Sequence, residues 1–135
     1  MPIKWNDSLA TGVRQIDLQH QELIEIINEL EAAHAAGRRV EALGEIIPRL
    51  RAYVLFHFGT EESLMATVAA PAHAAKHLQQ HEEFATRVAK LDSHRATAAD
   101  LDDLIGYLEH WLVEHIMKTD HEMGRLILDR MKIRE

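Results

Sequence analysis

Two pairs of side chains with helical spacing offer four metal ligands in one stretch of the sequence. His57 and Glu61 are four residues apart. The same spacing separates His77 from His81. Side chains four positions apart project from one face of an α-helix, one turn from each other. Each pair can therefore chelate a metal ion, and metal binding is the chemistry that this stretch predicts.

Three further candidate ligands lie on either side of this stretch. His20 occupies an inward position between Ile16 and Leu23 in an apolar helical pattern. His115 falls on the last apolar stripe, and Asp120 follows five residues later. A single inward histidine is most often an ordinary core residue, but burying so many unpaired polar groups would cost a few kcal/mol each, against a typical stability of about 5–15 kcal/mol. The candidate metal ligands are His20, His57, Glu61, His77, His81, His115 and Asp120.

The number and type of these ligands indicate two metal ions. The histidines and two bridging carboxylates, together with a bridging oxide or hydroxide, fill one octahedral ion and leave one position open on the other. Nitrogen and oxygen ligands without sulfur suit iron or manganese, whereas tetrahedral zinc would leave about half of the set unused. Iron is the metal that we expect.

Composition excludes several other functions. The chain contains no cysteine, so it has no disulfide, thiolate-bound zinc or cysteine nucleophile. Its net charge of −7 disfavours nucleic acid and anionic lipid as partners. No segment has the apolar length of a membrane span, and the first residues lack the apolar core of a signal peptide, so we expect a cytoplasmic location. At 135 residues, the chain is expected to form a single domain over 1–135.

The periodicity of apolar residues predicts an all-α fold. Short connections between four amphipathic helices favour an up-down-up-down antiparallel four-helix bundle. Pro48 falls inside the second helix and predicts a kink. His115 and Asp120 would lie about 140° apart on a regular helix, so a π-type widening or a helix end is expected between them. The predicted helices cover about 17–36, 40–65, 71–91 and 101–115, with an N-terminal arm over 1–16 and a C-terminal helical tail over 118–134.

Other metal and catalytic motifs find little support. The Glu-x-x-His motif of ferritin-like di-iron proteins occurs once, from Glu31 to His34, where such proteins need two. The His-Glu-x-x-His motif of zinc proteases is absent. No catalytic nucleophile or triad is evident, and no catalytic residue is assigned.

Five motifs, four of which contain candidate ligands, follow one another along nearly the whole chain. They are Asp17-x-x-His20-Gln21, His57-Phe58-x-x-Glu61-Glu62, Met65 followed by Pro71, His77-x-x-x-His81-x-x-Phe84, and Trp111-Leu112-x-x-His115-Ile116-x-x-x-Asp120. In order and approximate spacing, the chain resembles the hemerythrins, especially the single-domain bacterial ones. The resemblance implies that His77, His81 and His115 bind a six-coordinate iron, that His20 and His57 bind a five-coordinate iron, and that Glu61 and Asp120 bridge the two ions.

The resemblance also implies a function. Two iron ions, Fe²⁺ or Fe³⁺, bridged by an oxo or hydroxo group, would bind dioxygen reversibly as hydroperoxide at the five-coordinate iron, for oxygen storage, transport or buffering. The alternatives are an oxygen or redox sensor and a di-iron oxidoreductase that consumes peroxide or nitric oxide. Dioxygen is the expected partner, without nucleic acid or membrane insertion, and a monomer is favoured. The residues expected to line an apolar oxygen pocket are Leu23, Phe58, Trp111, Leu112 and Ile116.

Two positions depart from the family pattern. Relatives often have tyrosine before the proline and three residues after the bridging aspartate, whereas this chain has Ala70 and Met123. We expect these changes to open or rearrange the rim of the pocket, and either to speed autoxidation or to ease the access of peroxide. Asp17 and Glu62 are candidate partners that orient imidazoles. The remaining histidines, which are expected to be mostly exposed and receive no role, are His34, His73, His94, His110 and His121.

Overall fold

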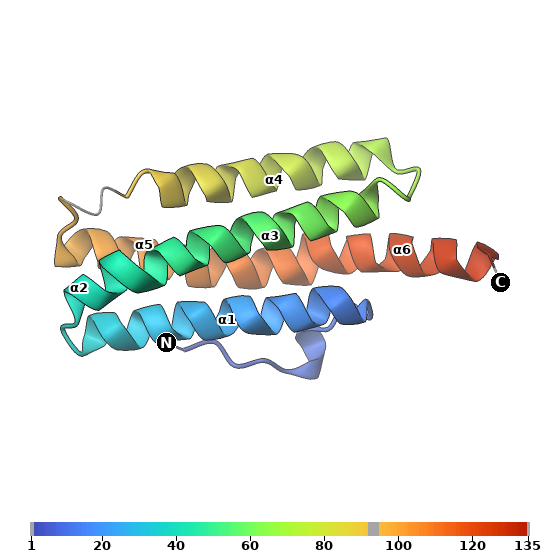
Figure 1. Cartoon of the computed structure of the whole chain (residues 1–135). Coiled ribbons are helices and arrows are strands. Elements are labelled where there is room, and N and C mark those ends of the chain that lie inside the picture. The colour runs from blue at the N-terminus through green and yellow to red at the C-terminus, as the bar shows by residue number, and fades with distance from the viewer. Residues whose placement is uncertain (1, 92–94, 135) are drawn as a thin grey trace.

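Four long helices lie side by side and alternate in direction (Figure 1). The computed structural model describes residues 2–91 and 95–134. The predicted all-α, up-down-up-down bundle is confirmed. The helices of the bundle are α1 (Arg14–Ala35), α3 (Ile47–Met65), α4 (Pro71–Ala89) and α5 (Ala98–His115), and α6 (His121–Arg134) extends beyond α5.

The predicted N-terminal arm is present, and it lies along α1 (Figure 1). It contains one short 3-10 helix, η1 (Asp7–Leu9), in which Leu9 is buried. The Ile3 N–H donates to Asn28 Oδ1 at 2.9 Å, and Asn28 Nδ2 donates to the Ile3 carbonyl at 2.8 Å. The amide of one α1 residue thus satisfies both backbone groups of Ile3 and holds the arm against the bundle.

Local sequence signals explain where the helices begin and end. Gly37 follows α1 with φ of +74°, a conformation that glycine adopts without a steric penalty. At the start of α5, Thr97 Oγ1 accepts from the Asp100 N–H while the Asp100 carboxylate accepts from the Thr97 N–H. This reciprocal arrangement is a capping box, which satisfies backbone N–H groups at the start of the helix.

Two π-helical turns interrupt the helices. The first, η2 (Ala42–Ile46), connects the short helix α2 (Arg39–Glu41) to α3 and precedes Pro48. The irregularity expected at Pro48 therefore lies just before it, and Pro48 itself sits in the first turn of α3, where a missing N–H is tolerated. The second π turn, η3 (Ile116–Asp120), joins α5 to α6 and confirms the widening predicted after His115.

The buried apolar residues form two clusters. The main cluster draws on every helix of the bundle and includes the fully buried Leu30, Leu50 and Leu104. The second apolar cluster consists of Ile16, Met65, Met123 and Ile127. Along α1, along α3, and along the continuous segment α5–η3–α6, the candidate ligands lie between residues of the main cluster and residues of the second cluster. Apolar side chains therefore flank the site at both ends. Within the described residues, no helix is long and apolar enough to cross a membrane.

Candidate metal centre

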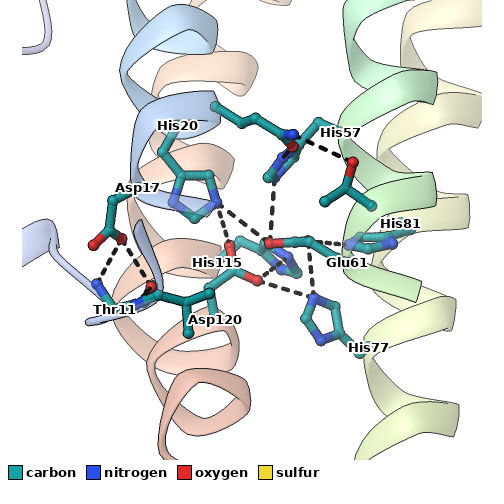
Figure 2. Close-up of polar contacts among 12 residues, drawn as sticks. Thr11, Asp17, His20, His57, Glu61, His77, His81, His115 and Asp120 are labelled. Carbon is teal, nitrogen blue, oxygen red and sulfur yellow. Dashed lines mark hydrogen bonds and ion pairs between the residues drawn. The ribbon is translucent and has the colours of Figure 1, made fainter. Parts of the chain in front are cut away.

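All seven candidate ligands converge inside the bundle (Figure 2). His20 comes from α1, His57 and Glu61 from α3, and His115 from the end of α5. His77 and His81 lie on α4, and Asp120 ends η3. Each of these residues is buried, with exposed fractions between 0 and 4 %. Every long helix therefore contributes at least one potential metal ligand to the same buried place.

Glu61 directs its two carboxylate oxygens toward different histidines. Its Oε2 lies 3.4 Å from His20 Nε2 and 3.3 Å from His57 Nε2. Its Oε1 lies 3.3 Å from His77 Nε2 and 2.9 Å from His81 Nε2. A single carboxylate thus faces two separate groups of imidazoles.

Asp120 divides its oxygens in the same way. Its Oδ2 is 2.9 Å from His20 Nε2, whereas its Oδ1 is 2.9 Å from His77 Nε2 and 3.1 Å from His115 Nε2. The π turn η3 gives Asp120 this inward position, because five residues of regular helix would have turned it away from the side of His115. We call His77, His81 and His115 the three-histidine half of the site, and His20 and His57 the two-histidine half.

Ligand atoms within each half are close enough to surround one cation. In the three-histidine half with Glu61, and in the two-histidine half with both carboxylates, the potential ligand atoms lie within 4.8 Å of one another. Glu61 belongs to both groups, and Asp120 touches histidines of both.

The pattern of unpaired atoms fits a bound cation. Leaving buried nitrogen and oxygen atoms without hydrogen bonds is costly, and most proteins avoid it. Apart from His20 Nδ1, the unpaired atoms face other ligands at the centre of the site, and imidazole nitrogen with carboxylate oxygen is a donor set that suits iron or manganese. The buried ligand atoms that lack a hydrogen-bond partner are His20 Nδ1 and Nε2, Glu61 Oε2, His77 Nε2, His115 Nε2, and Asp120 Oδ1 and Oδ2.

The electrostatics of the metal-free site favour protonated imidazoles. Burial lowers the pKa of His20, but the carboxylates of Asp120 and Glu61, which lie 2.9 and 3.4 Å from its Nε2, outweigh burial and raise it to about 9. The same balance raises the pKa of His77 to about 9. Burial raises the pKa of Glu61, yet close contacts with the surrounding histidines, beginning with His20, hold it well below its ordinary value. A metal that binds here must therefore displace protons.

Two glutamine side chains orient one histidine ligand in each half. The His57 Nδ1 lies 2.7 Å from Gln19 Oε1, and the His115 Nδ1 lies 2.6 Å from Gln80 Oε1. An imidazole that binds metal through Nε2 carries its proton on Nδ1, so each of these nitrogens donates to an amide oxygen. Gln80 Oε1 also accepts from Thr119 Oγ1 at 2.7 Å and thereby contacts η3 as well.

One of the two carboxylates expected to orient imidazoles does so. Glu62 Oε2 lies 3.1 Å from His81 Nδ1, as predicted. The prediction for Asp17 is wrong, because its Oδ1 accepts from the backbone and hydroxyl of Thr11, and its Oδ2 accepts from the Gly12 N–H. Asp17 thus fastens the end of the arm, next to Gly124 of α6, where a Cβ would come within 2.6 Å of the Thr11 carbonyl oxygen.

The histidines left without a role are less exposed than predicted. His110 is exposed as predicted, whereas His34 and His121 are half-buried. His94 lies outside the described residues. His73 is buried, with an exposed fraction of 7 %, and its Nε2 lies 3.1 Å from His77 Nδ1. The sequence contained a signal for this contact, because His73 precedes His77 by one helical turn.

Two of the residues predicted to line an oxygen pocket stack on ligand histidines. The Phe58 ring stacks on His81, with 3.8 Å between ring centroids and 6° between planes. Trp111 stacks on His115 at 4.3 Å and 13°. Their assignment as an oxygen pocket stays a prediction. All of the predicted pocket residues belong to or pack against the main apolar cluster, where Trp111 is half-buried and Leu23, Phe58, Leu112 and Ile116 are buried.

The two departures from the expected family pattern lie in different surroundings. Ala70 immediately precedes α4 and is half-buried. Met123 has an exposed fraction of 0 % and packs with Ile16, Met65 and Ile127 in the second apolar cluster. Whether these two residues open or rearrange the rim of an oxygen pocket stays a prediction.

Comparison with known proteins gives a consistent answer. The family model for the hemerythrin HHE cation-binding domain matches residues 11–127. A bacteriohemerythrin from Pseudomonas aeruginosa (strain LESB58) is 36% identical over 135 residues, covering 93% of this chain and 87% of the relative. A bacteriohemerythrin from Stenotrophomonas maltophilia (strain R551-3) is 38% identical over 117 residues, covering 86% of this chain and 75% of the relative. A crystal structure of wild-type hemerythrin superimposes with a TM-score of 0.82 at 28% identity, over 94% of this chain and 98% of that one.

The matched segment begins at Thr11 in the arm and ends at Ile127 in the second apolar cluster. It includes all seven candidate ligands and every long helix of the bundle. The sequence match and the fold match therefore cover the same part of the molecule. The chain belongs to the hemerythrin family.

Proposed function

We propose that the chain is a non-haem di-iron protein that binds dioxygen reversibly, for storage, transport or buffering of oxygen. The observation that carries this proposal is the arrangement of Glu61 and Asp120, each of which turns one oxygen toward either half of the site. A carboxylate placed in this way can bridge two cations. Membership of the hemerythrin family and the relatives named bacteriohemerythrin support the same function.

The two halves of the site would hold different iron ions with different numbers of histidines. His77, His81 and His115 would hold one iron, and His20 and His57 would hold the other. The two-histidine half supplies one imidazole fewer, so it is the half where dioxygen would bind. When bound, the iron ions would supply the electrons that reversible binding of dioxygen requires.

The surroundings of the site favour release over irreversible oxidation. Leu23, Leu112 and Ile116 are buried apolar side chains within three residues of a ligand histidine in the sequence, and Phe58 stacks on one face of His81. Apolar walls exclude water and proton donors from a reacting site. We therefore propose a binding protein rather than an enzyme, in which the side chains position the ions and keep the site dry.

The proposal is tested by metal analysis combined with optical spectra. The chain should bind two iron ions, and the anaerobically reduced protein should gain a charge-transfer band in air and lose it again under argon over repeated cycles. The exposed His110 offers a control, because His110→Ala should leave the stoichiometry and the cycle unchanged. Fewer than two iron ions per chain, or no new band in air, would contradict the proposal. Turnover of peroxide or nitric oxide well above the rate of autoxidation would identify an oxidoreductase instead.

A further inference from the structure

His73 lies between a candidate metal ligand and the surface. Its Nε2 is 3.1 Å from His77 Nδ1, and its Nδ1 is 3.0 Å from Glu122 Oε1. Lys76 Nζ donates to the other carboxylate oxygen of Glu122 at 3.1 Å. His73 is buried, whereas the Glu122 side chain is 38 % exposed. A series of contacts thus leads from inside the site to solvent, through residues that do not themselves face the metal position.

The donor and acceptor roles in this series follow from the orientation of His77. The His77 Nε2 faces Glu61 and Asp120 at the centre of the site. When Nε2 binds a metal, the imidazole proton resides on Nδ1, and His73 Nε2 must accept it as a hydrogen bond. The His73 proton then resides on Nδ1 and is donated to Glu122. Every polar atom of both rings is satisfied in this one arrangement.

The series also ties two elements together at the site. His77 and His73 belong to α4, whereas Glu122 lies in the first turn of α6, two residues after Asp120. The His77 Nε2 meets Asp120 Oδ1 on the inner side at 2.9 Å, and its Nδ1 reaches Glu122 through His73 on the outer side. Both sides of the His77 ring are therefore held by the η3–α6 segment.

We propose that His73 is a positioning residue of the three-histidine half, which together with Glu122 fixes the orientation of His77 and makes its Nε2 a stronger metal ligand. This inference rests on the proposed di-iron function. A carboxylate that accepts a proton from a ligand histidine orients the ring and increases its basicity. Glu62 acts on His81 directly, whereas Glu122 acts on His77 through the inserted imidazole of His73.

Variants separate the parts of the Glu122–His73–His77 network. His73→Leu removes the acceptor for His77, and His73→Gln restores an acceptor oxygen on a side chain of similar length. Glu122→Gln removes the negative charge but keeps an oxygen. Glu82→Gln is the matched control, because it removes one charge from an exposed position of α4. The affinities for two Co²⁺ ions, and for two Fe²⁺ ions under argon, are measured by competition with a chelator.

We expect His73→Leu to lower the affinity for one of the two ions about 10–100-fold and to leave the other nearly unchanged. His73→Gln should recover most of the loss, Glu122→Gln should show a smaller loss, and Glu82→Gln should match the unaltered protein. Proton NMR of the Co²⁺-loaded protein gives a second readout, since each ligand histidine contributes a paramagnetically shifted, exchangeable N–H signal. One such signal should move in Glu122→Gln and exchange faster with water in His73→Leu.

The inference and the proposed function fail in different ways. If the unaltered protein binds fewer than two ions, the di-iron proposal fails. If it binds two ions but His73→Leu retains both affinities, or the shifted N–H signals of Glu122→Gln match those of the unaltered protein, the role of His73 is overturned. Glu122 lies at the surface, so Glu122→Gln decides the question even if His73→Leu does not fold.

Discussion

The two halves of the site differ in how firmly their histidines are held. In the three-histidine half, every Nδ1 has a partner, and these partners are His73, Glu62 and Gln80. In the two-histidine half, Gln19 holds His57, but the buried Nδ1 of His20 has no hydrogen-bond partner within the described part of the chain. One half therefore has both more imidazoles and better-fixed imidazoles than the other.

This difference predicts different roles for the two halves: the three-histidine half binds its metal ion tightly, and the two-histidine half binds an outside ligand. Partners that orient ligand histidines typically change metal affinity 10–100-fold. We expect the ion in the three-histidine half to bind first and to leave last. The ion in the two-histidine half should bind more weakly and keep the position at which an outside ligand can bind.

Removing the residue shared by both halves should have the largest effect. Glu61→Ala takes an oxygen from each half and leaves the surrounding imidazoles without their common anionic partner. We expect the metal content after loading and desalting to fall from two ions per chain to nearly none. Glu82→Ala is the control and should retain both ions, since Glu82 lies at an exposed position of α4. Two ions retained in Glu61→Ala would show that the halves do not depend on a shared carboxylate.

Metal-free protein should lose stability as the pH rises. His20 and His77, one in each half, have pKa values raised to about 9 in the folded state, above an ordinary value of about 6.5. Their stabilising effect is therefore fully present below pH 6.5 and is lost as the pH rises through 9. Because the pKa of Glu61 is lowered, its contribution is constant over this range.

Urea unfolding at pH 6.5 and pH 9.5 measures this effect. We expect the free energy of unfolding of the chelator-treated protein to fall on the order of several kcal/mol. The metal-loaded protein should not show this loss, because the ions replace the protons. A metal-free protein that is equally stable at both pH values would contradict the description of the site.

The second apolar cluster should stabilise the end of the molecule next to the two-histidine half. Ile16 of this cluster precedes His20 by one turn, and Met123 is fully buried against it. Met123→Ala should lower the free energy of unfolding by about 2–5 kcal/mol. Met131→Ala, at an exposed position, is the control and should change it little. A loss below about 1 kcal/mol for Met123→Ala would mean that the site is not sealed by this cluster.

Replacing the two glutamines should act on opposite halves. Gln80→Leu removes the acceptor for His115, and Gln19→Leu removes the acceptor for His57. In stepwise Co²⁺ titrations, we expect Gln80→Leu to weaken the tighter step and Gln19→Leu to weaken the looser step, each about 10–100-fold. If both variants weaken the same step, the assignment of glutamines to halves is wrong.

The sequence predicted those features that depend on spacing along one helix. The apolar residues at helical spacing predicted the bundle, and the candidate ligands at inward positions of the same helices predicted one shared site. The five-residue interval from His115 to Asp120 predicted the π turn, because only a widened helix lets both residues face inward.

Features that depend on contacts between helices could not be predicted in this way. Gln80 meets His115 across the α4–α5 contact, and Gln19 meets His57 across the α1–α3 contact. Helix spacing does not determine which polar residue of a neighbouring helix comes opposite an imidazole. For the same reason, the prediction that Asp17 orients an imidazole is wrong, because Asp17 binds the arm.

Diffraction from crystals of the iron-loaded protein, recorded at the iron absorption edge, tests the central claim most directly. We predict two anomalous peaks inside the bundle. One should lie within bonding distance of His77, His81 and His115, the other within bonding distance of His20 and His57, and Glu61 and Asp120 should bond to both. A single peak, or a second peak away from the two-histidine half, would contradict a two-iron centre with unequal halves.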